Sequence, residues 1–374
     1  MKILHICNDY TGSRVHYHLC KELEKLGVTQ TIFTYYKKKS NKAGKNYINS
    51  DRCTIYYMPI INWYYKFFYH IKNRVIYRYL INTIQKNITS YTCIHASTLF
   101  TDGGIAYRVK KKYNIPYVVC VRSTDVDSFL VMAPHAWIDG IKILLNAERI
   151  FFPSVSLKNK FCKHWFIRMF LNQISFKLSV VPNGIDEYWL HNIVHQKLFT
   201  NNLLFIGSLI KRKNILRVIK AANILNKEYP NIKLYIVGDG PIKKKCEKIA
   251  SHNPNIIYCG PINEKDKLKD LFKRCGIFVM PSWHETFGLV YVEALSQNLK
   301  LLYSKGTGID GLLDDKVGVA VNPHSLSSII IGLKSLILKK DYTNPNRNVD
   351  FCNFDWSCIA KKYYHAYLEI LENK

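Results

Sequence analysis

Two carboxylates flank a tight turn in the stretch PSWHETFGLVYVEAL, residues 281–295. Glu285 follows an apolar run of strand length, and Glu293 comes eight residues later, inside a run of helical composition. A helix that starts after Gly288 would direct backbone N–H groups and the positive end of its dipole at an anion, and glycine would let the ligand come close. The amides at that helix start are those of Phe287, Gly288 and Leu289.

The spacing of the two acids also suits a polar ligand. Helical side chains lean toward the amino terminus, so Glu293 can return toward the loop that carries Glu285. Carboxylates in that place accept hydrogen bonds from sugar hydroxyls. The alternative for Glu293 is an ordinary acid on a helix surface, although apolar neighbours make that position less comfortable. We therefore expect this stretch to cup the sugar and diphosphate of an activated donor.

A second anion-binding loop is indicated by IGSLIKRKNI, residues 206–215. A glycine at a strand end is followed by Ser208 and then by Lys211, Arg212 and Lys213, so a diphosphate could lie against amides and a cation. A solvated basic loop is the alternative. The glycines of VGDGP, residues 237–241, lack the third glycine of a dinucleotide-binding motif and are weak evidence by themselves.

Length and charge set the class of protein. A chain of 374 residues exceeds the size at which one core keeps growing, and 48% hydrophobic with 22% charged residues is typical of globular proteins. The net charge of +27, from 54 Lys+Arg and 27 Asp+Glu, favours partners such as nucleic acid, anionic lipid or phosphorylated substrates. A biased genome composition explains the charge equally well.

The cysteines indicate no metal site. Eleven of them are spread through apolar segments without Cys-x-x-Cys pairs or suitably spaced histidines, so we expect reduced thiols in the cytoplasm and no bound metal. The amino terminus runs into a strand pattern without the features of a signal peptide. No apolar run approaches the roughly 20 residues that span a bilayer. These features predict a soluble or peripheral protein.

Strand-length apolar runs alternate with helical periods, which predicts an α/β fold with parallel sheets. Two doubly wound, Rossmann-like halves explain the pattern, with a boundary near 183–200. The expected strands are residues 2–7, 28–36, 93–97, 117–123 and 149–154 in the first half, and residues 202–208, 233–240, 255–260, 276–282 and 299–304 in the second.

Residues 60–80 are aromatic and basic, with few acids. On a helix, Trp63, Phe67, Phe68 and Tyr77 would be buried while Lys66, Lys72, Arg74 and Arg78 stay in water. Such a helix suits the interface of an anionic membrane. An amphipathic helix that covers the first sheet is an equally good interpretation.

The motifs of the second half resemble those of family 4 retaining glycosyltransferases. PSWHETFGLVYVEAL is similar to the Glu-x7-Glu signature of that family, and IGSLIKRKN, VVPNGID, YIVGDGP and YCGPI follow in the family's order and spacing. The first half resembles a bacterial polysaccharide subgroup more loosely. The resemblance implies a GT-B fold, two Rossmann-like domains facing a central cleft: 1–182 for the acceptor, 183–354 for the donor, and a helix, 355–374, that packs back on the first domain.

The resemblance also implies roles for single residues. Glu285 would hold the transferred sugar and Glu293 the ribose. The amides of Phe287, Gly288 and Leu289, with Lys213, would face the diphosphate, Ile262 would lie beside the base, and Gly12 would lie near the phosphates in the first loop of the chain.

Two departures from the family pattern change the expected roles. Ser208 stands where an arginine is common, which leaves Lys213, with Arg212, to supply positive charge. Arg122, in VRSTD, stands where many members carry a histidine, so Arg122 or Asp125 becomes the expected contact at the reacting centre. Glu285, Lys213, Arg122 and Asp125 are therefore the predicted catalytic residues.

The predicted function is transfer of a sugar from a nucleotide-diphosphate donor to a glycan or lipid-linked acceptor, in the synthesis of a capsule, O-antigen or related surface polysaccharide. We expect a cytoplasmic enzyme on the inner face of the membrane, with the nucleotide sugar as co-substrate, no further cofactor and no nucleic-acid partner. The alternatives are a glycoside hydrolase, because paired acids also serve that chemistry, and a non-catalytic basic module that binds membrane or nucleic acid.

Overall fold

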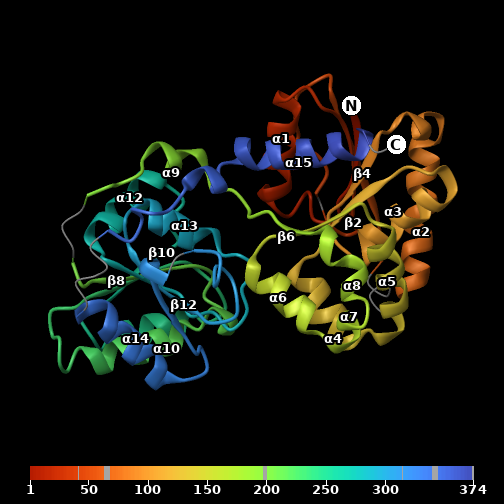
Figure 1. Cartoon of the computed structure of the whole chain (residues 1–374). Coiled ribbons are helices and arrows are strands. Elements are labelled where there is room, and N and C mark those ends of the chain that lie inside the picture. The colour runs from red at the N-terminus through yellow and green to blue at the C-terminus, as the bar shows by residue number, and fades with distance from the viewer. Residues whose placement is uncertain (41, 63–67, 197–199, 314, 339–343, 373–374) are drawn as a thin grey trace. The chain divides into compact units, whose positions relative to one another are not determined.

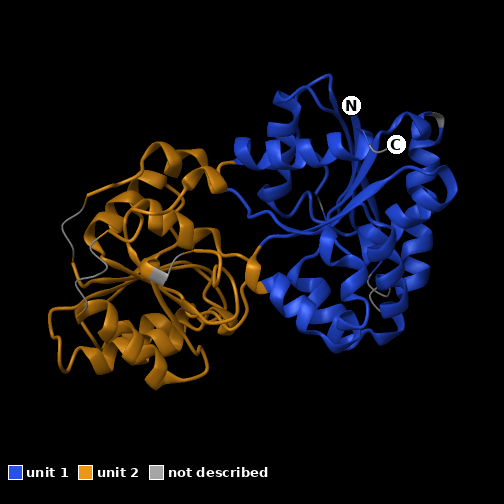
Figure 2. Cartoon of the chain, viewed as in Figure 1, with its two compact units in different colours: residues 1–153, 157–184, 356–374 blue, residues 154–156, 185–355 orange. Residues whose placement is uncertain are grey.

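The computed structural model describes residues 1–40, 42–62, 68–196, 200–313, 315–338 and 344–372. The chain forms two compact units, shown in Figures 1 and 2. The first unit consists of Met1–Pro153, Leu157–Gly184 and Trp356–Lys374, and the second of Ser154–Ser156 and Ile185–Asp355. The chain therefore leaves the first unit two residues after the predicted boundary, and its last helix belongs to the first unit.

The first unit is built on a seven-stranded parallel sheet in the order β3-β2-β1-β4-β5-β6-β7. Its strands are β1 (Lys2–Ile6), β2 (Thr29–Lys37), β3 (Cys53–Ile61), β4 (Cys93–Ala96), β5 (Tyr117–Cys120), β6 (Arg149–Phe152) and β7 (Leu178–Val180). The helices are α1 (Arg14–Lys25), α2 (Tyr69–Ile84), α3 (Thr101–Tyr113), α4 (Leu130–Met132), α5 (Trp137–Asn146), α6 (Val155–Lys163), α7 (Trp165–Arg168), α8 (Leu171–Ile174) and α15 (Trp356–Glu372).

Alternate residues along these strands pack into two separate hydrophobic cores, one on each face of the sheet. Leu4 of β1, with Tyr117 and Val119 of β5, packs under α2, α3 and α5. The neighbouring positions, such as Ile3 and Val118, face the opposite way and pack under α1 and α15. This is the period of two that a sheet covered on both faces requires.

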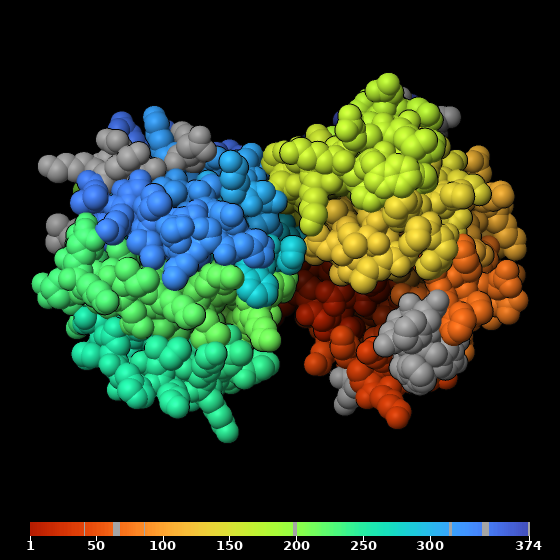
Figure 3. Space-filling view, turned by 90° about the horizontal axis from the view of Figure 1, so that it is seen from below, coloured from red at the N-terminus to blue at the C-terminus, as the bar shows by residue number. Residues whose placement is uncertain are grey.

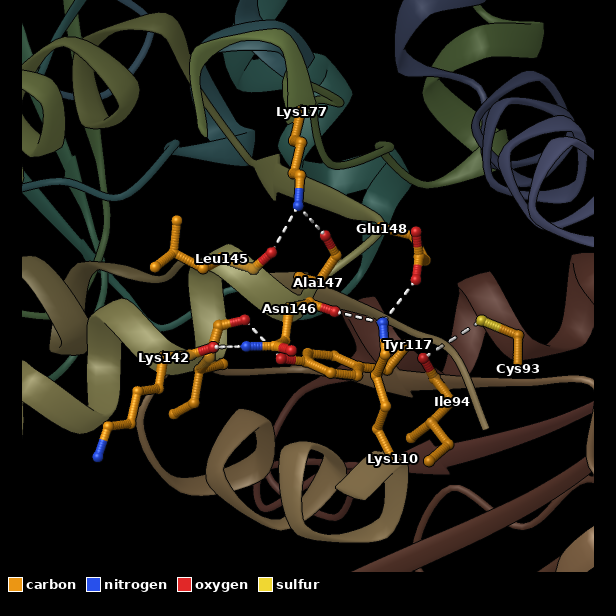
Figure 4. Close-up of polar contacts among 11 residues, drawn as sticks. Cys93, Ile94, Lys110, Tyr117, Lys142, Leu145, Asn146, Ala147, Glu148 and Lys177 are labelled. Carbon is orange, nitrogen blue, oxygen red and sulfur yellow. Dashed lines mark hydrogen bonds and ion pairs between the residues drawn. The ribbon is translucent and has the colours of Figure 1, made fainter. Parts of the chain in front are cut away.

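The carboxyl end of α5 is fixed by two lysines (Figure 4). Lys177 Nζ donates to the carbonyl oxygens of Leu145 and Ala147 at 2.7 and 2.8 Å, and Lys110 Nζ donates to the carbonyl of Asn146 at 2.7 Å. Cations at this end of a helix satisfy unpaired carbonyls and oppose the negative end of the dipole. The position of α5 in the first unit is thereby set.

The second unit has a six-stranded parallel sheet in the order β10-β9-β8-β11-β12-β13. The strands are β8 (Leu203–Ile206), β9 (Leu234–Val237), β10 (Ile256–Gly260), β11 (Ile277–Val279), β12 (Lys300–Ser304) and β13 (Gly318–Val321). The helices are α9 (Glu187–His191), α10 (Ile215–Leu225), α11 (Lys243–Ala250), α12 (Lys265–Arg274), α13 (Leu289–Ser296) and α14 (Leu326–Leu338). Helices α10 and α14 lie together on one face, while α12 and α13 lie on the other (Figure 1).

The ten predicted strands are confirmed, and the structure adds β3, β7 and β13. All three lie at the edges of their sheets, β3 and β7 in the first and β13 in the second. Edge strands are half-covered or short, and β3 contains a proline, so their sequences lack the continuous apolar run that marks a central parallel strand.

In the aromatic and basic segment at 60–80, the buried residues agree with the interpretation of a helix that covers the first sheet. Helix α2 begins at Tyr69 and buries Tyr69, Asn73, Ile76 and Leu80 against the sheet. The burial predicted for Phe68 is wrong, because that side chain is 52% exposed. The solvent exposure predicted for Lys72 is wrong too, because burial lowers its pKa. Trp63, Lys66 and Phe67 lie outside the described residues.

A buried polar network joins α15 to the first sheet. The Tyr367 hydroxyl lies 2.5 Å from His95 Nδ1, and His95 Nε2 lies 3.3 Å from the Cys120 sulfur. All three side chains are at most 1% exposed. Buried polar groups need partners, so this network specifies how α15 is placed.

The cysteines differ from expectation at two positions. Nine are free, and seven of those nine are buried, as reduced core thiols should be. Cys352 and Cys358 are disulfide-bonded, so the prediction of eleven reduced thiols is wrong for this pair.

Within the described residues, no single helix has the length and apolar composition to cross a membrane. One bent pair, Asp125–Met132 with Pro134–Asn146, meets both criteria when its two parts are taken together, with an angle of 103° between them.

We predict that Tyr367→Phe lowers the free energy of unfolding by about 1–3 kcal/mol, because a buried histidine nitrogen loses its partner. Urea unfolding measures this. Tyr364→Phe on the same helix is the matched control, since that hydroxyl has no hydrogen bond within the described residues, and it should change stability by less than about 0.5 kcal/mol. Equal effects of the two changes would contradict an anchoring role for the network.

Candidate active site

The second sheet reverses its strand order between β8 and β11, and open parallel sheets bind ligands beyond the carboxyl ends of the strands at such a point. The loop after β8 carries Ser208, Arg212 and Lys213, and the loop after β11 carries Glu285 and Gly288. The two predicted anion-binding loops are therefore neighbours in the fold, although more than sixty residues separate them in the sequence.

Gly288 has the geometry that the sequence predicted. It precedes α13 with φ +83°, a conformation that favours glycine. A Cβ at this position would lie 2.6 Å from ring atoms of the buried Tyr291, whose hydroxyl donates to the Met280 carbonyl at 2.5 Å. The ring cannot move aside, so a side chain at position 288 would distort the start of α13.

Lys213 and Glu285 form an ion pair between Nζ and Oε2. Their side chains are only 15% and 12% exposed. The pair places a cation and a carboxylate together at the switch point, where one group suits a phosphate oxygen and the other a sugar hydroxyl.

Asn214, which the sequence analysis did not select, holds the two loops in register. It is buried with φ +64°, and its Nδ2 donates to the carbonyls of Pro281 and Pro323 at 2.9 and 2.8 Å. The Trp283 amide donates to the Arg212 carbonyl at 2.8 Å. An asparagine directly after a basic run could have signalled this role, because asparagine tolerates the left-handed conformation.

The loop after β12 supports Glu285 from another side. The Glu285 amide donates to Thr307 Oγ1 at 2.8 Å, and that hydroxyl donates back to the Glu285 carbonyl at 2.7 Å. The Gly308 amide donates to the same carbonyl at 3.0 Å. Thr307 and Gly308 were not predicted, because nothing in a local pattern links the loop after β12 to the loop after the neighbouring strand β11.

Glu293 lies further along α13, in a separate acidic group. Burial raises its pKa to about 7, with a further rise from Asp186 and an opposing effect from Lys265. Asp186 forms an ion pair with Lys265 at 2.7 Å. It also caps α9, because its carboxylate accepts a hydrogen bond from the Tyr188 amide at 3.0 Å. Glu293 is thus no ordinary surface acid, and the charged groups that act on it are the Asp186 carboxylate and the Lys265 ammonium.

The other predicted ligand contacts divide by exposure. Ser208 and Arg212 are exposed at the carboxyl edge of the sheet, and Arg212 Nη1 donates to the His284 carbonyl at 3.3 Å. Leu289 and Ile262 are half-buried. Phe287 is 2% exposed with its ring packed against Phe354, so only its backbone remains for a ligand.

The predicted residues of the first unit lie at the carboxyl edge of its sheet: Gly12 follows β1, at the switch point between β1 and β4, and Arg122 and Asp125 follow β5, the strand beside β4. A Cβ at Gly12 would lie 2.2 Å from Asp9 Oδ1. Burial raises the pKa of Asp9, and the charges of Lys42 and Arg122 oppose that rise. Arg122 Nε donates to the Ser97 carbonyl at 3.3 Å.

Asp125 requires a correction, because its carboxylate is not free to contact a substrate. The side chain is 1% exposed and accepts from the amides of Leu99, Phe100 and Arg122 at 3.1, 3.2 and 2.8 Å. It therefore positions the loops after β4 and β5. Arg122 keeps the expected place at the edge of the sheet, and its contact with a substrate stays a prediction.

A second buried acid of the first unit, Asp102, was missed. It is 0% exposed and accepts from the Tyr35 hydroxyl at 2.5 Å and from Thr98 Oγ1 at 3.0 Å. Burial raises its pKa to about 7. Within the described residues, no group of three His, Cys, Asp or Glu side chains could hold a metal ion.

Family models match both units. The model described as Glycosyltransferase Family 4 matches residues 12–188, and the model described as Glycosyl transferases group 1 matches residues 193–349. The chain belongs to the family 4 glycosyltransferases. Its two parallel-sheet units have the GT-B fold, and the chain is a transferase.

Relatives and solved structures agree with this assignment. The chain is 22% identical to TuaC of Bacillus subtilis, a glycosyltransferase assigned to teichuronic acid biosynthesis, over 98% of each chain. It is 23% identical to the alpha-monoglucosyldiacylglycerol synthase of Streptococcus pneumoniae over 94% of this chain and 80% of that protein. The structure of Anabaena HepE in complex with UDP and glucose superposes with a TM-score of 0.67 at 14% identity, covering 99% of this chain and 100% of that one.

Family membership decides between the interpretations that the sequence left open. A glycoside hydrolase and a non-catalytic basic module were the alternatives, and neither describes a member of a transferase family.

We predict that Glu293→Gln changes the pH dependence of stability. A pKa raised from 4.5 to about 7 means that the folded protein resists ionising Glu293, so wild type loses stability as pH rises across that window. Relative to wild type, the variant should gain at most about 3 kcal/mol between about pH 4 and pH 8. Thermal unfolding at several pH values measures this, and Glu264→Gln, at an exposed acid, should show no such gain. A pH-independent difference would refute the raised pKa.

We predict that Asp125→Ala lowers the free energy of unfolding by about 3 kcal/mol or more, because buried amides lose a charged acceptor. Asp127→Ala is the matched control in the same turn. Asp127 is 28% exposed and pairs with the partly exposed Lys160, so its loss should cost about 1 kcal/mol or less. Calorimetry on both variants measures these losses in stability. If Asp125→Ala is as stable as wild type, Asp125 does not hold the loops, and the substrate contact predicted from the sequence is again the better interpretation.

Proposed function

We propose that the enzyme transfers a sugar from a nucleotide-diphosphate donor to a lipid-linked or glycan acceptor in the synthesis of a surface glycan. The donor would bind at the switch point of the second unit, with the diphosphate against the start of α13 and Lys213. The observation that carries this proposal is the largely buried Lys213–Glu285 pair beside Gly288. The UDP and glucose bound by Anabaena HepE support a nucleotide sugar as the donor.

The chemistry follows from where charge develops. Departure of the nucleotide diphosphate leaves negative charge on a phosphate oxygen and positive charge at the anomeric carbon, so stabilising the phosphate is the main task. The Lys213 ammonium and the amides of Phe287, Gly288 and Leu289 would supply that stabilisation. Glu285 would accept hydrogen bonds from hydroxyls of the transferred sugar and orient it.

The route of the acceptor proton completes the mechanism. Retention of anomeric configuration, which the resemblance implied, would require attack on the same face as the leaving group. The leaving phosphate oxygen would then take the proton of the acceptor hydroxyl. We propose that no metal or additional cofactor takes part, so transfer should persist in the presence of a chelator.

The remaining predicted contacts would bind the nucleotide and the acceptor. Glu293 would accept from the ribose hydroxyls, and Ile262 would lie beside the base. Gly12 and Arg122 belong to the first unit, where the acceptor would bind. The names of the two relatives, one assigned to teichuronic acid and one to a glucosyl diacylglycerol, favour an acceptor of a bacterial surface or lipid glycan. With such an acceptor, the enzyme would act at the cytoplasmic face of the membrane.

We predict that Lys213→Ala lowers kcat about a hundredfold, because one good donor at a developing oxyanion contributes about 3 kcal/mol. The assay follows transfer from labelled nucleotide sugars, first screened for thermal stabilisation of the protein. Lys211→Ala is the matched control in the same basic run, since Lys211 is exposed, and it should change kcat less than about threefold.

Two results would contradict the proposal. If Lys213→Ala and Lys211→Ala have equal kcat, Lys213 does not take part in the reaction. If no nucleotide sugar stabilises the protein against thermal unfolding, the proposed donor site is wrong. Unfolding curves for Lys213→Ala are required as well, because Glu285 then lacks its partner and part of the loss in rate could follow from instability.

A further inference from the structure

Large apolar side chains are exposed unequally on the two units. Thirteen such residues are at least 43% exposed in the described chain, ten on the first unit and three on the second. Those of the first unit are Tyr47, Phe68, Ile71, Tyr79, Val131, Met132, Ile138, Trp165, Met169 and Phe176, and those of the second are Ile224, Ile331 and Leu338. Scattered exposed apolar residues are normal, but a concentration of them marks a binding surface.

Seven of the ten form one surface, which we name the α4–α7 surface: Phe68, Ile71, Val131, Met132, Ile138, Trp165 and Met169. Ring contacts connect its parts. Trp165 lies 5.5 Å from Trp137, which precedes Ile138, and Trp137 Nε1 donates to the Phe129 carbonyl at 3.2 Å. Phe129 lies 6.0 Å from Tyr69, the residue after Phe68.

Most of this surface comes from one stretch of the chain. Viewed from below in Figure 3, the yellow and yellow-green atoms of residues 130–180 lie together on the first unit. With Phe68 and Ile71, the surface takes its residues from the start of α2, helices α4 and α7, and the first turn of α5.

The bent segment 125–146 carries large apolar side chains on its outer side as well as on its inner side. Leu130, Ala136, Ile141 and Leu144 fill the core on its inner side. Helices that cover a core usually carry polar residues on the outer side, whereas this segment carries Val131, Met132 and Ile138 there, which are 66%, 72% and 64% exposed. The outer side thus has a composition suited to a second apolar environment.

The segments that carry the α4–α7 surface are rich in basic residues. Residues 68–79 and 130–177 together contain ten Lys or Arg and two acids, Asp139 and Glu148. Both acids have partners, since Asp139 lies 3.3 Å from His70 Nδ1 and Glu148 lies 2.7 Å from Lys110 Nζ. Five exposed basic side chains form no ion pair within the described residues: Arg74, Arg78, Lys142, Lys163 and Arg168.

We propose that the α4–α7 surface docks into the interface of a membrane that contains anionic lipids. Apolar side chains would enter the boundary between headgroups and acyl chains, and the surrounding cations would bind lipid phosphates. A second copy of the chain fits this surface less well, because like charges would face each other around a shared apolar centre. The inference rests on the proposed function in one respect, that a lipid-linked acceptor would be delivered at this surface.

The membrane contact therefore differs from the one that the sequence suggested. Helix α2 uses much of its apolar side to cover the sheet, and its start contributes only Phe68 and Ile71 to the surface. Most of the surface comes from helices more than fifty residues further along the chain.

Flotation of the full chain with vesicles tests the proposal, using phosphatidylcholine alone and phosphatidylcholine with phosphatidylglycerol. Wild type should bind the anionic vesicles, and less as salt increases. The double variant Met132→Ser/Trp165→Ser should bind at least about tenfold more weakly, because the protein loses two apolar side chains that would be buried in the membrane interface. Ile331→Ser/Leu338→Ser, on the second unit, is the matched control and should bind as wild type does.

Charge is tested separately. Lys163→Glu/Arg168→Glu should lose most binding to anionic vesicles, whereas Lys220→Glu/Lys227→Glu, an equal change of charge on the second unit, should lose much less. Thermal unfolding of all four variants shows whether each is folded, and nucleotide-sugar binding should be unchanged in all of them. That last measurement separates failure of membrane docking from failure of the proposed function.

Three outcomes would overturn the proposal. If Met132→Ser/Trp165→Ser and Lys163→Glu/Arg168→Glu both float with anionic vesicles as wild type does, the α4–α7 surface does not bind the membrane. If wild type binds neutral and anionic vesicles equally, anionic lipid is not part of the binding site. Light scattering that shows a dimer without vesicles, dissociated by Met132→Ser/Trp165→Ser, would make the surface an interface between copies.

Discussion

An ion pair that is mostly shielded from water, Lys213 with Glu285, joins the two loops at the switch point of the second unit. Withdrawing two charges from water is costly unless their geometry is good and the surrounding groups are satisfied. The structure meets that condition with backbone contacts, through Asn214 on one loop and Thr307 on another. Hydrogen bonds thus hold the loops at the switch point to one another, and a diphosphate sugar would meet groups that are already oriented.

The first unit meets a similar constraint with acids that no ligand needs to touch. Asp125 and Asp102 are buried. Asp125 accepts from three backbone amides of the loops after β4 and β5, and Asp102 accepts from Tyr35 of β2 and from Thr98 after β4. A buried carboxylate fixes every donor that points to it, since leaving one unpaired is costly. In this way two core residues determine the loops in which an acceptor would bind, while the half-buried Arg122 remains for contact.

The apolar residues of the first unit serve two environments. Those of the inner faces fill the cores on either side of the sheet, and α15 closes one of these cores with Tyr363 and Tyr367. Those of the α4–α7 surface are more than half exposed in the part of the chain that the structure describes, and lysines and arginines lie on the same segments. The net charge of +27 thus has a local meaning on this face, whatever the genome composition contributes to the rest.

The sequence by itself determined the two parallel-sheet halves, ten of their thirteen strands, and the loop residues Lys213, Glu285 and Gly288. It could do so because strand runs, glycine turns and basic runs are local patterns. Tertiary structure alone decided that Lys213 pairs with Glu285, that Asn214 and Thr307 brace them, and that Asp125 supports backbone instead of facing a substrate. It also decided where the apolar surface lies. Each of these depends on which side chains burial brings together, and burial joins residues that are far apart in the chain.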